Sequence, residues 1–194
     1  MPTDLPLDPD MIQAADEMAA VFRQANVLYA LIGGVAVSIR SNPRSTRDLD
    51  FILSVPQMRL PSLLQSLRDH GFEFDDMQVI REWTQEGMTV LSYRGIRVDW
   101  LKPVLAAYQH ILERATDEGW KDQFIRVATT EGLILLKLLA FRPQDQADIV
   151  NLIAAHEGPL NIDWIRSEWD AILDADHPRM RWFLGHCKKA DLNQ

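Results

Sequence analysis

The spacing of hydrophobic residues changes along the chain and predicts two kinds of element. Over residues 11–25, apolar side chains recur every three to four positions, which is typical of a helix with one buried face. Asp8 or Asp10 caps this predicted helix, and Pro9 falls in its first turn. The short apolar runs at residues 27–32 and 48–55 are instead typical of buried strands.

The remaining elements are predicted from the same two periods. Residues 57–70 form an amphipathic helix that ends at Gly71. Alternating positions on either side of Arg94-Gly95 predict a hairpin. The full set adds hairpin strands at residues 88–93 and 96–101, extended stretches at 72–74 and 124–127, helices at 35–39, 104–114, 130–141, 144–155 and 163–173, and a last helix after Pro178.

This order of elements predicts an α/β (α+β) fold. Strands and helices alternate in the first half, so we expect a small mixed sheet with helices on one face. From about Pro103 onward the predicted elements are mainly helical. The second half is therefore expected to form a helical subdomain beside the sheet.

Composition and charge narrow the classes of function. The 194 residues are 47% hydrophobic and 25% charged, which is ordinary for a globular protein. The net charge of −8 repels a nucleic-acid backbone at long range, although Arg40, Arg44 and Arg47 form a local basic group on which transfer RNA could dock. A single cysteine rules out a disulfide framework. Residues 1–10 lack the basic start of a signal peptide, and no apolar run approaches the roughly 18 residues of a membrane span, so we expect a cytoplasmic protein without membrane contact.

Three aspartates stand on predicted strands in positions that share a face. Side chains alternate along a strand, so Asp48 and Asp50 project together while the residues between and after them form an apolar face. Asp99 occupies a similar position on the strand at residues 96–101, with Arg97 on the same face. Adjacent carboxylates repel one another unless a cation lies between them, and Mg²⁺ prefers oxygen ligands. If the two strands are neighbours, the three carboxylates can hold two metal ions about 3.5–4 Å apart.

Each acid also has a simpler interpretation. The Asp-x-Asp spacing is weak evidence alone, because it occurs three times and the copies near the two chain ends stand at helix caps or on the surface. Asp48 would then be a water-exposed residue at the start of a strand. Asp99 would be an exposed hairpin residue paired with Arg97 or Lys102.

The glycine pair Gly33-Gly34 closes the first predicted strand and opens a helix. Glycine permits positive φ and close approach of the backbone to a ligand. The first N–H groups of a helix are free to bind anions, so a triphosphate could be held here. The alternative is a tight strand-to-helix connection without a ligand.

The glycine pair and the acids together resemble the signature of the nucleotidyltransferase superfamily, which has the polymerase-beta-like fold. The matching segments are Ile32-Gly33-Gly34, Arg44, Thr46, Asp48-Leu49-Asp50-Phe51 and, for the third acid, Arg97-Val98-Asp99. The resemblance implies that Asp48, Asp50 and Asp99 are catalytic and bind metal. It also implies nucleotide binding by Gly33, Gly34, Arg44 and Thr46. Gly34 stands where many members carry serine, which keeps the backbone contact to phosphate but weakens a hydroxyl contact.

A later segment resembles the minimal AbiEii-like nucleotidyltransferases, relatives of the toxins of type IV toxin–antitoxin systems. Here Lys137 is followed by Arg142, Asp145 and Asp148, with Pro143-Gln144 where a basic residue is usual. In such relatives the lysine reaches the nucleotide phosphates, and we expect the two aspartates to support Lys137 or Arg142 rather than to bind metal. The alternative for Lys137 is a lysine at a helix edge whose amino group reaches solvent.

The resemblance implies a domain division and a reaction. Residues 1–102 are expected to form the nucleotidyltransferase catalytic core, and residues 103–194 a mainly helical subdomain that completes the cleft. Two Mg²⁺ ions and a nucleoside triphosphate donor are expected, with transfer of the nucleoside monophosphate to a small molecule, a tRNA or a protein. The alternative is a catalytically silent nucleotide-binding or regulatory module, as part of a toxin–antitoxin pair controlled by a partner protein.

Two further candidate sites have weaker support. A soft-metal site is weakly indicated by His177, His186 and Cys187. A second cysteine and a Cys-x-x-Cys spacing, which would support a zinc site, are missing. Trp164 and Trp169 stand beside acidic residues and could flank an acceptor, but their default interpretation is core packing.

Overall fold

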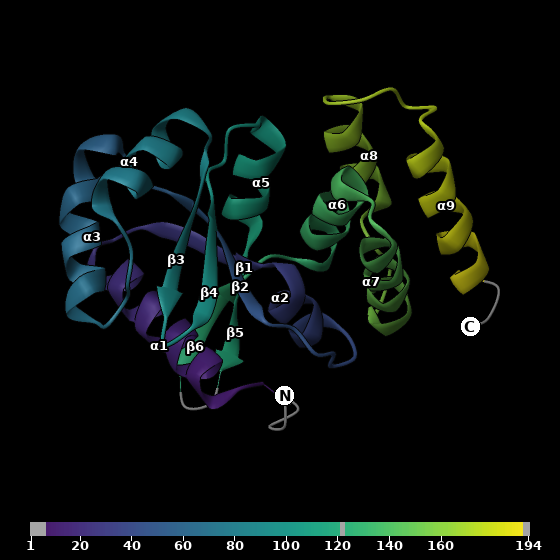
Figure 1. Cartoon of the computed structure of the whole chain (residues 1–194). Helices are drawn as coiled ribbons and strands as arrows, with labels where there is room; N and C mark the ends of the chain where they lie inside the picture. The colour runs from purple at the N-terminus through teal and green to yellow at the C-terminus, as the bar shows by residue number, and fades with distance from the viewer. Residues whose placement is uncertain (1–6, 121–122, 192–194) are drawn as a thin grey trace.

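A computed structural model describes residues 7–120 and 123–191 of the 194-residue chain (Figure 1). The expectation that residues 1–10 form no signal peptide falls mostly on residues 1–6, which lie outside this range. Within the described residues, no helix combines the length and apolar character needed to cross a membrane.

Six strands form one mixed sheet in the order β3-β4-β2-β1-β6-β5. Strand β1 pairs antiparallel with β2 and parallel with β6, while β2 pairs parallel with β4. The hairpins β3–β4 and β5–β6 are antiparallel. The strands are β1 (Leu28–Ile32), β2 (Asp48–Ser54), β3 (Met88–Tyr93), β4 (Ile96–Leu101), β5 (Thr116–Trp120) and β6 (Gln123–Val127). The predicted mixed sheet is confirmed.

The helices alternate with the strands up to β6 and are uninterrupted after it. They are α1 (Pro9–Gln24), α2 (Gly33–Arg40), α3 (Leu60–Asp69), α4 (Asp76–Gln85), α5 (Ala106–Arg114), α6 (Thr130–Ala140), α7 (Pro143–Ala155), α8 (Ile162–Asp170) and α9 (Pro178–Asp191), with a short 3-10 turn at Gln57–Arg59. The side chain of Asp8 caps α1 by accepting a hydrogen bond from the backbone N–H of Asp10.

Sequence patterning missed two of these elements for a physical reason. In α4 the only buried side chains are those of Val79 and Trp83, so its apolar period is too sparse to recognise. Strand β5 has the sequence TDEGW, which lacks the alternation of a half-buried strand. The strand expected at residues 72–74 is only a single bridge from Glu73 to Ser92.

One part of the core lies between the sheet and α1, α3 and α4, which run along one face of it (Figure 1), and the same cluster of buried residues continues into α2 and α5 to α9. Phe22 of α1 contacts three aromatic rings, with centroid distances of 5.0 Å to Tyr29, 5.7 Å to Phe51 and 5.7 Å to Trp100. These rings come from β1, β2 and β4, so the apolar face predicted for the acid-bearing strand is the face that packs. The acids occupy the opposite face, on the side where α2 and α5 lie (Figure 1).

The helices α6 to α9 form a group beyond α2 and α5 (Figure 1). The sheet itself continues past residue 103, because β6 pairs with β1 and β5 pairs with β6. The part of the chain without strands therefore begins at Thr130, the first residue of α6. The division into domains at residues 102 and 103 stays a prediction.

We predict that Phe22→Ala lowers the free energy of unfolding by about 3–5 kcal/mol, because it leaves a cavity among three aromatic rings. Urea denaturation followed by circular dichroism measures this. Met58→Ala is the control, because Met58 is 95% exposed and its loss is expected to cost less than about 0.5 kcal/mol. Equal effects of the two substitutions would show that Phe22 does not anchor the core.

Candidate active site

The parallel register of β2 and β4 brings the three predicted acids onto neighbouring strands. Asp50 lies directly opposite Asp99, and Asp48 lies opposite Arg97. Since side chains at positions i and i+2 share a face, all four side chains project from the same face of the sheet. The condition set by the sequence, that the two strands are neighbours, is met.

Asp50 is held against the start of α2. Gly33 has φ +67°, and a Cβ atom there would lie 1.9 Å from Oδ2 of Asp50, so this position requires glycine on two grounds. The N-cap residue Ile32 offers no side-chain hydrogen bond to α2. The carboxylate of Asp50 stands in that place and is bonded by the backbone N–H of Gly34.

The surroundings of Asp50 favour its protonated form. Burial raises the pKa of Asp50 from its ordinary value of 3.8 to about 6, and the charges of Asp99 and Asp48 add to the effect. Lys137 and the hydrogen bond from Gly34 act in the opposite direction but do not compensate. The carboxylate of Asp50 thus loses hydration on burial that Lys137 and the hydrogen bond from Gly34 do not replace.

Asp99 is paired with Arg97 on its own strand, as one sequence interpretation expected. Nε of Arg97 donates a hydrogen bond of 3.0 Å to Oδ2 of Asp99, and Nη2 lies 2.9 Å from Oδ1. Oδ1 is nonetheless buried without a well-directed hydrogen bond. The hydrogen bond that Arg97 donates to Asp99, followed by the charges of Asp99, Asp48 and Asp50, raises the pKa of Arg97.

Among the described residues, no three His, Cys, Asp or Glu side chains are gathered in a metal-binding arrangement. The donor set nevertheless fits a hard divalent cation. Three carboxylates share one face of the sheet, Asp50 has a raised pKa, and Oδ1 of Asp99 lacks a hydrogen bond. Asp48, Asp50 and Asp99 are the residues that would hold such an ion.

Thr46 and Arg44 lie against the second glycine. A Cβ atom on Gly34 would come 2.6 Å from Oγ1 of Thr46 and 3.0 Å from Nη2 of Arg44. A serine at position 34 would therefore collide with Thr46. The threonine hydroxyl already occupies the space beside the first turn of α2, which accounts for the departure from the Gly-Ser pattern.

The positive side of the site is organised by two buried aspartates of α7. Nζ of Lys137 lies 3.0 Å from Oδ1 of Asp145 and 2.8 Å from Oδ2 of Asp148. Asp148 also binds Arg44 at 2.8 and 3.0 Å, and Asp145 binds Nε of Arg142 at 2.8 Å. Burial alone would raise the pKa of Asp145, but hydrogen bonds from Arg142 and Lys137 outweigh it and hold the pKa below its usual range. The supporting position expected for the two aspartates is thus observed.

A cleft of about 360 Å³ joins these two sides. Asp50 of β2 and Gly33 at the start of α2 line it on one side, and Lys137 of α6, Asp145 of α7 and Arg142, the N-cap residue of α7, line it on the other. The other lining residues, none of which was a predicted site residue, are Ile32, Met88, Leu101, Tyr108, Leu133, Leu136, Leu139 and Ala140. Their contribution is largely apolar, and burial raises the pKa of Tyr108 above its ordinary value. A lining that combines charged and apolar side chains is typical of a site for a ligand with a polar group and a ring.

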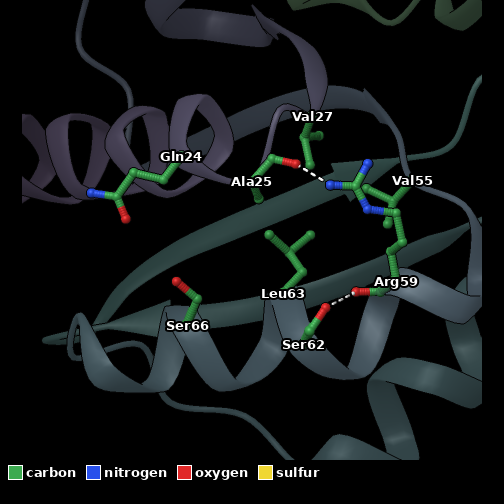
Figure 2. Close-up of a pocket in the computed structure, with 8 residues that line it drawn as sticks. All are labelled: Gln24, Ala25, Val27, Val55, Arg59, Ser62, Leu63 and Ser66. Carbon is green, nitrogen blue, oxygen red and sulfur yellow. Dashed lines mark hydrogen bonds between the residues drawn. The ribbon is translucent and has the colours of Figure 1, made fainter.

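A smaller cavity of about 250 Å³ lies between the end of α1 and the start of α3 (Figure 2). Arg59 reaches across it and donates a hydrogen bond to the carbonyl of Ala25, while Ser62 donates to the carbonyl of Arg59 (Figure 2). None of the predicted site residues lines this cavity. The arginine therefore ties α3 to the turn after α1.

The weaker candidates of the sequence do not assemble. His177 packs against Trp169, and Nδ1 of His186 contacts the carbonyl of Trp182, so the two histidines are engaged separately. Trp169 is fully buried and its indole N–H donates to the carbonyl of Asp174, which is core packing as the default interpretation had it.

Comparison with known proteins found no matching family model and no match among curated proteins. Solved structures do match. A nucleotidyltransferase-like protein from Paracoccidioides brasiliensis has 16% identity and a TM-score of 0.53, over 96% of this chain and 92% of that chain. The chain has the nucleotidyltransferase fold.

Two antibiotic-modifying enzymes have the same fold. The lincosamide antibiotic adenylyltransferase LnuA, with lincomycin bound, has 18% identity and a TM-score of 0.50, over 74% of this chain and 97% of that chain. ANT(2")-Ia, in complex with adenylyl-2"-tobramycin, has 11% identity and a TM-score of 0.50, over 94% and 98%. The predicted fold class is confirmed, while the narrower likeness to AbiEii-like proteins stays a prediction.

We predict that Asp50→Asn stabilises the protein without metal. A pKa raised in the folded state means that stability is complete below about pH 4 and is lost as pH rises through about 6. The asparagine variant is expected to exceed the wild type by about 3 kcal/mol at neutral pH and to match it near pH 4. Urea denaturation in the presence of a chelator at both pH values measures this difference.

The matched control is Asp170→Asn, because Asp170 is exposed at the end of α8. It is expected to leave stability unchanged at both pH values. A destabilised Asp50→Asn variant at neutral pH would contradict the raised pKa.

We predict that Gly34→Ser lowers the free energy of unfolding by about 1–3 kcal/mol, because the added side chain collides with Thr46. In a Thr46→Gly background the same substitution is expected to cost at least about 1 kcal/mol less. The four variants of this cycle are compared by urea denaturation. An equal cost in both backgrounds would show that Thr46 does not fill the space beside Gly34.

Proposed function

We propose that this protein is a nucleotidyltransferase, which transfers a nucleoside monophosphate from a nucleoside triphosphate to a hydroxyl group of an acceptor. The observation that carries the proposal is the cleft of about 360 Å³ in which Gly33 and Asp50 face Lys137 and Arg142. Carboxylates for metal and cations for phosphate thus meet across a space of ligand size. The nucleotidyltransferase fold supports the proposal.

The donor is proposed to lie with its phosphates beside the charged side chains that line the cleft. The backbone N–H groups at the start of α2 and the side chains of Thr46, Arg44 and Lys137 would bind the phosphate oxygens. Asp145 and Asp148 hold Lys137 and Arg44 in place, so these cations are already oriented before the donor arrives. The part lined by Tyr108 and Leu133 would receive the base or the acceptor.

Asp48, Asp50 and Asp99 are proposed to hold divalent metal, with Mg²⁺ as the natural ion and two ions as the expected number. When bound, Mg²⁺ would neutralise negative charge on the triphosphate oxygens and so lower the barrier to the displacement of pyrophosphate. Asp99 is proposed to accept the proton of the acceptor hydroxyl. The oxygen of that hydroxyl then bonds to the α-phosphorus and the bond to pyrophosphate breaks. The protein contributes mainly orientation and charge.

Among the acceptors considered, we favour a small molecule. The two adenylyltransferases named above carry the antibiotic lincomycin and an adenylylated tobramycin, and the match spans 97% and 98% of their chains. The basic group proposed for tRNA is already committed in part, because Arg40 pairs with Glu118 and Arg44 with Asp148. The net charge of −8 favours a cationic acceptor. We propose a cytoplasmic location for this reaction, because nucleoside triphosphates are available there.

A second candidate function is a silent nucleotide-binding or regulatory module, in the manner of one half of an AbiEii-like toxin–antitoxin pair. The observation that favours it is the pairing of Asp99 with Arg97, which engages the third acid. Such a module would bind triphosphate with metal but release no pyrophosphate.

We predict that calorimetric titration detects binding of at least one of the four nucleoside triphosphates when Mg²⁺ is present. The double variant Asp48→Asn/Asp50→Asn is expected to weaken this binding at least about 100-fold, because it removes two metal ligands. Asp170→Asn is the control and is expected to bind as the wild type does. Pyrophosphate release with a panel of cationic hydroxylated small molecules then tests turnover.

Wild-type protein that binds none of the four triphosphates in the presence of Mg²⁺ would refute the proposal. Metal-dependent binding without pyrophosphate release from any acceptor would favour the silent module.

A further inference from the structure

Arg97 stands among the three acids, and its surroundings differ from those of the other cations in the site. It projects from the same face of β4 as Asp99, two residues away, and lies opposite Asp48 on β2. Its guanidinium contacts both oxygens of Asp99, at 3.0 and 2.9 Å. It is therefore a cation in direct contact with one of the three carboxylates that would hold a metal ion.

Lys137 and Arg44 are held by buried carboxylates, whereas Arg142 binds Asp145 rather than one of the three acids. Lys137 has an exposed fraction of only 8% and contacts two fully buried carboxylates, and Arg44 is paired with one of them. Arg97 has a side chain that is 55% exposed and pairs with a single carboxylate that is 23% exposed. An exposed ion pair contributes little and is readily exchanged, whereas a buried network is not.

The geometry points to an exchange at Asp99: Arg97 neutralises this carboxylate while the metal site is empty, and it gives the carboxylate up when a divalent ion and a triphosphate bind. This inference rests on the proposed function and adds a residue to it. Released from Asp99, the guanidinium is close to the phosphates that the ion brings with it. Guanidinium groups form bidentate hydrogen bonds with phosphate as they do with carboxylate, so the triphosphate replaces Asp99 as the partner of Arg97.

Two features of the site follow from such an exchange. Asp99 is paired with Arg97 although it lies opposite Asp50 in the strand register. Oδ1 of Asp99 is close to Arg97 yet lacks a well-directed hydrogen bond, so the pair leaves part of the carboxylate unsatisfied. When Asp99 binds metal and no phosphate is present, the guanidinium of Arg97 has lost the carboxylate with which it was paired. Metal and triphosphate are then expected to bind with positive coupling.

The test is titration with Mn²⁺ in the absence of nucleotide, followed by electron paramagnetic resonance of the free ion. We predict that Arg97→Ala binds Mn²⁺ about 3- to 10-fold more tightly than the wild type, because the competing cation is gone. Arg97→Lys keeps the charge but not the bidentate contact, and its affinity for Mn²⁺ is expected to lie between those of Arg97→Ala and the wild type. Arg81→Ala is the matched control, because it removes an exposed arginine from α4 and is expected to leave Mn²⁺ binding unchanged.

The titrations are repeated with a non-hydrolysable triphosphate. It is expected to tighten Mn²⁺ binding more in the wild type than in Arg97→Ala, since only the wild type has a guanidinium to transfer. The exchange would be overturned if Arg97→Ala bound Mn²⁺ no more tightly than the wild type. It would also be overturned if Arg97→Ala and Arg81→Ala changed Mn²⁺ binding to the same degree.

The double variant Asp48→Asn/Asp50→Asn separates this failure from that of the proposed function. If it abolishes Mn²⁺ binding while Arg97→Ala has no effect, the metal site stands and only the exchange is wrong. If it leaves Mn²⁺ binding intact, the ion binds elsewhere, and both the exchange and the proposed metal site are wrong.

Discussion

The parallel pairing of β2 with β4 sets two carboxylates directly opposite each other, and the rest of the site is arranged around that repulsion. Asp50 faces Asp99 across the strands, and burial, reinforced by the charge of Asp99, raises the pKa of Asp50 to about 6. The same two strands carry Phe51 and Trp100 on their other face, where both pack against Phe22 of α1. One face of the strand pair thus supplies the apolar burial that offsets the charge repulsion on the other.

The cations of the site fall into two groups with different physical roles. Lys137 and Arg44 belong to a network with the buried carboxylates of Asp145 and Asp148, and removing one member of such a network is costly. This network also joins α6 and α7 to the loop before β2, so it fixes the width of the cleft as well as the charge within it. Arg97 is itself half-exposed, is paired with Asp99 alone and is the cation that can move.

Local patterns of the sequence predicted the parts of the site that depend on one element each. Alternation along β2 placed Asp48 and Asp50 on one face, and the hairpin strands at residues 88–93 and 96–101 match β3 and β4 in full. Contacts between distant segments carry no such signal. The pairing of Arg44 with Asp148 spans 104 residues, and Tyr108 enters the cleft only through the packing of α5. From the sequence, the meeting of the three acids could be predicted only on the condition that β2 and β4 are neighbours, and the order of the strands meets that condition.

The glycine at position 34, where many family members carry serine, shows that a motif residue depends on the space its neighbours leave as well as on its own identity. A serine there would place its side chain where Oγ1 of Thr46 already lies, 2.6 Å from the position of a Cβ atom. The polar oxygen beside the first turn of α2 is therefore supplied by a loop residue twelve positions later in the sequence. Because two side chains cannot share that space, glycine at position 34 and threonine at position 46 constrain each other. The missing serine hence removes a residue from the motif without removing a hydroxyl from the site.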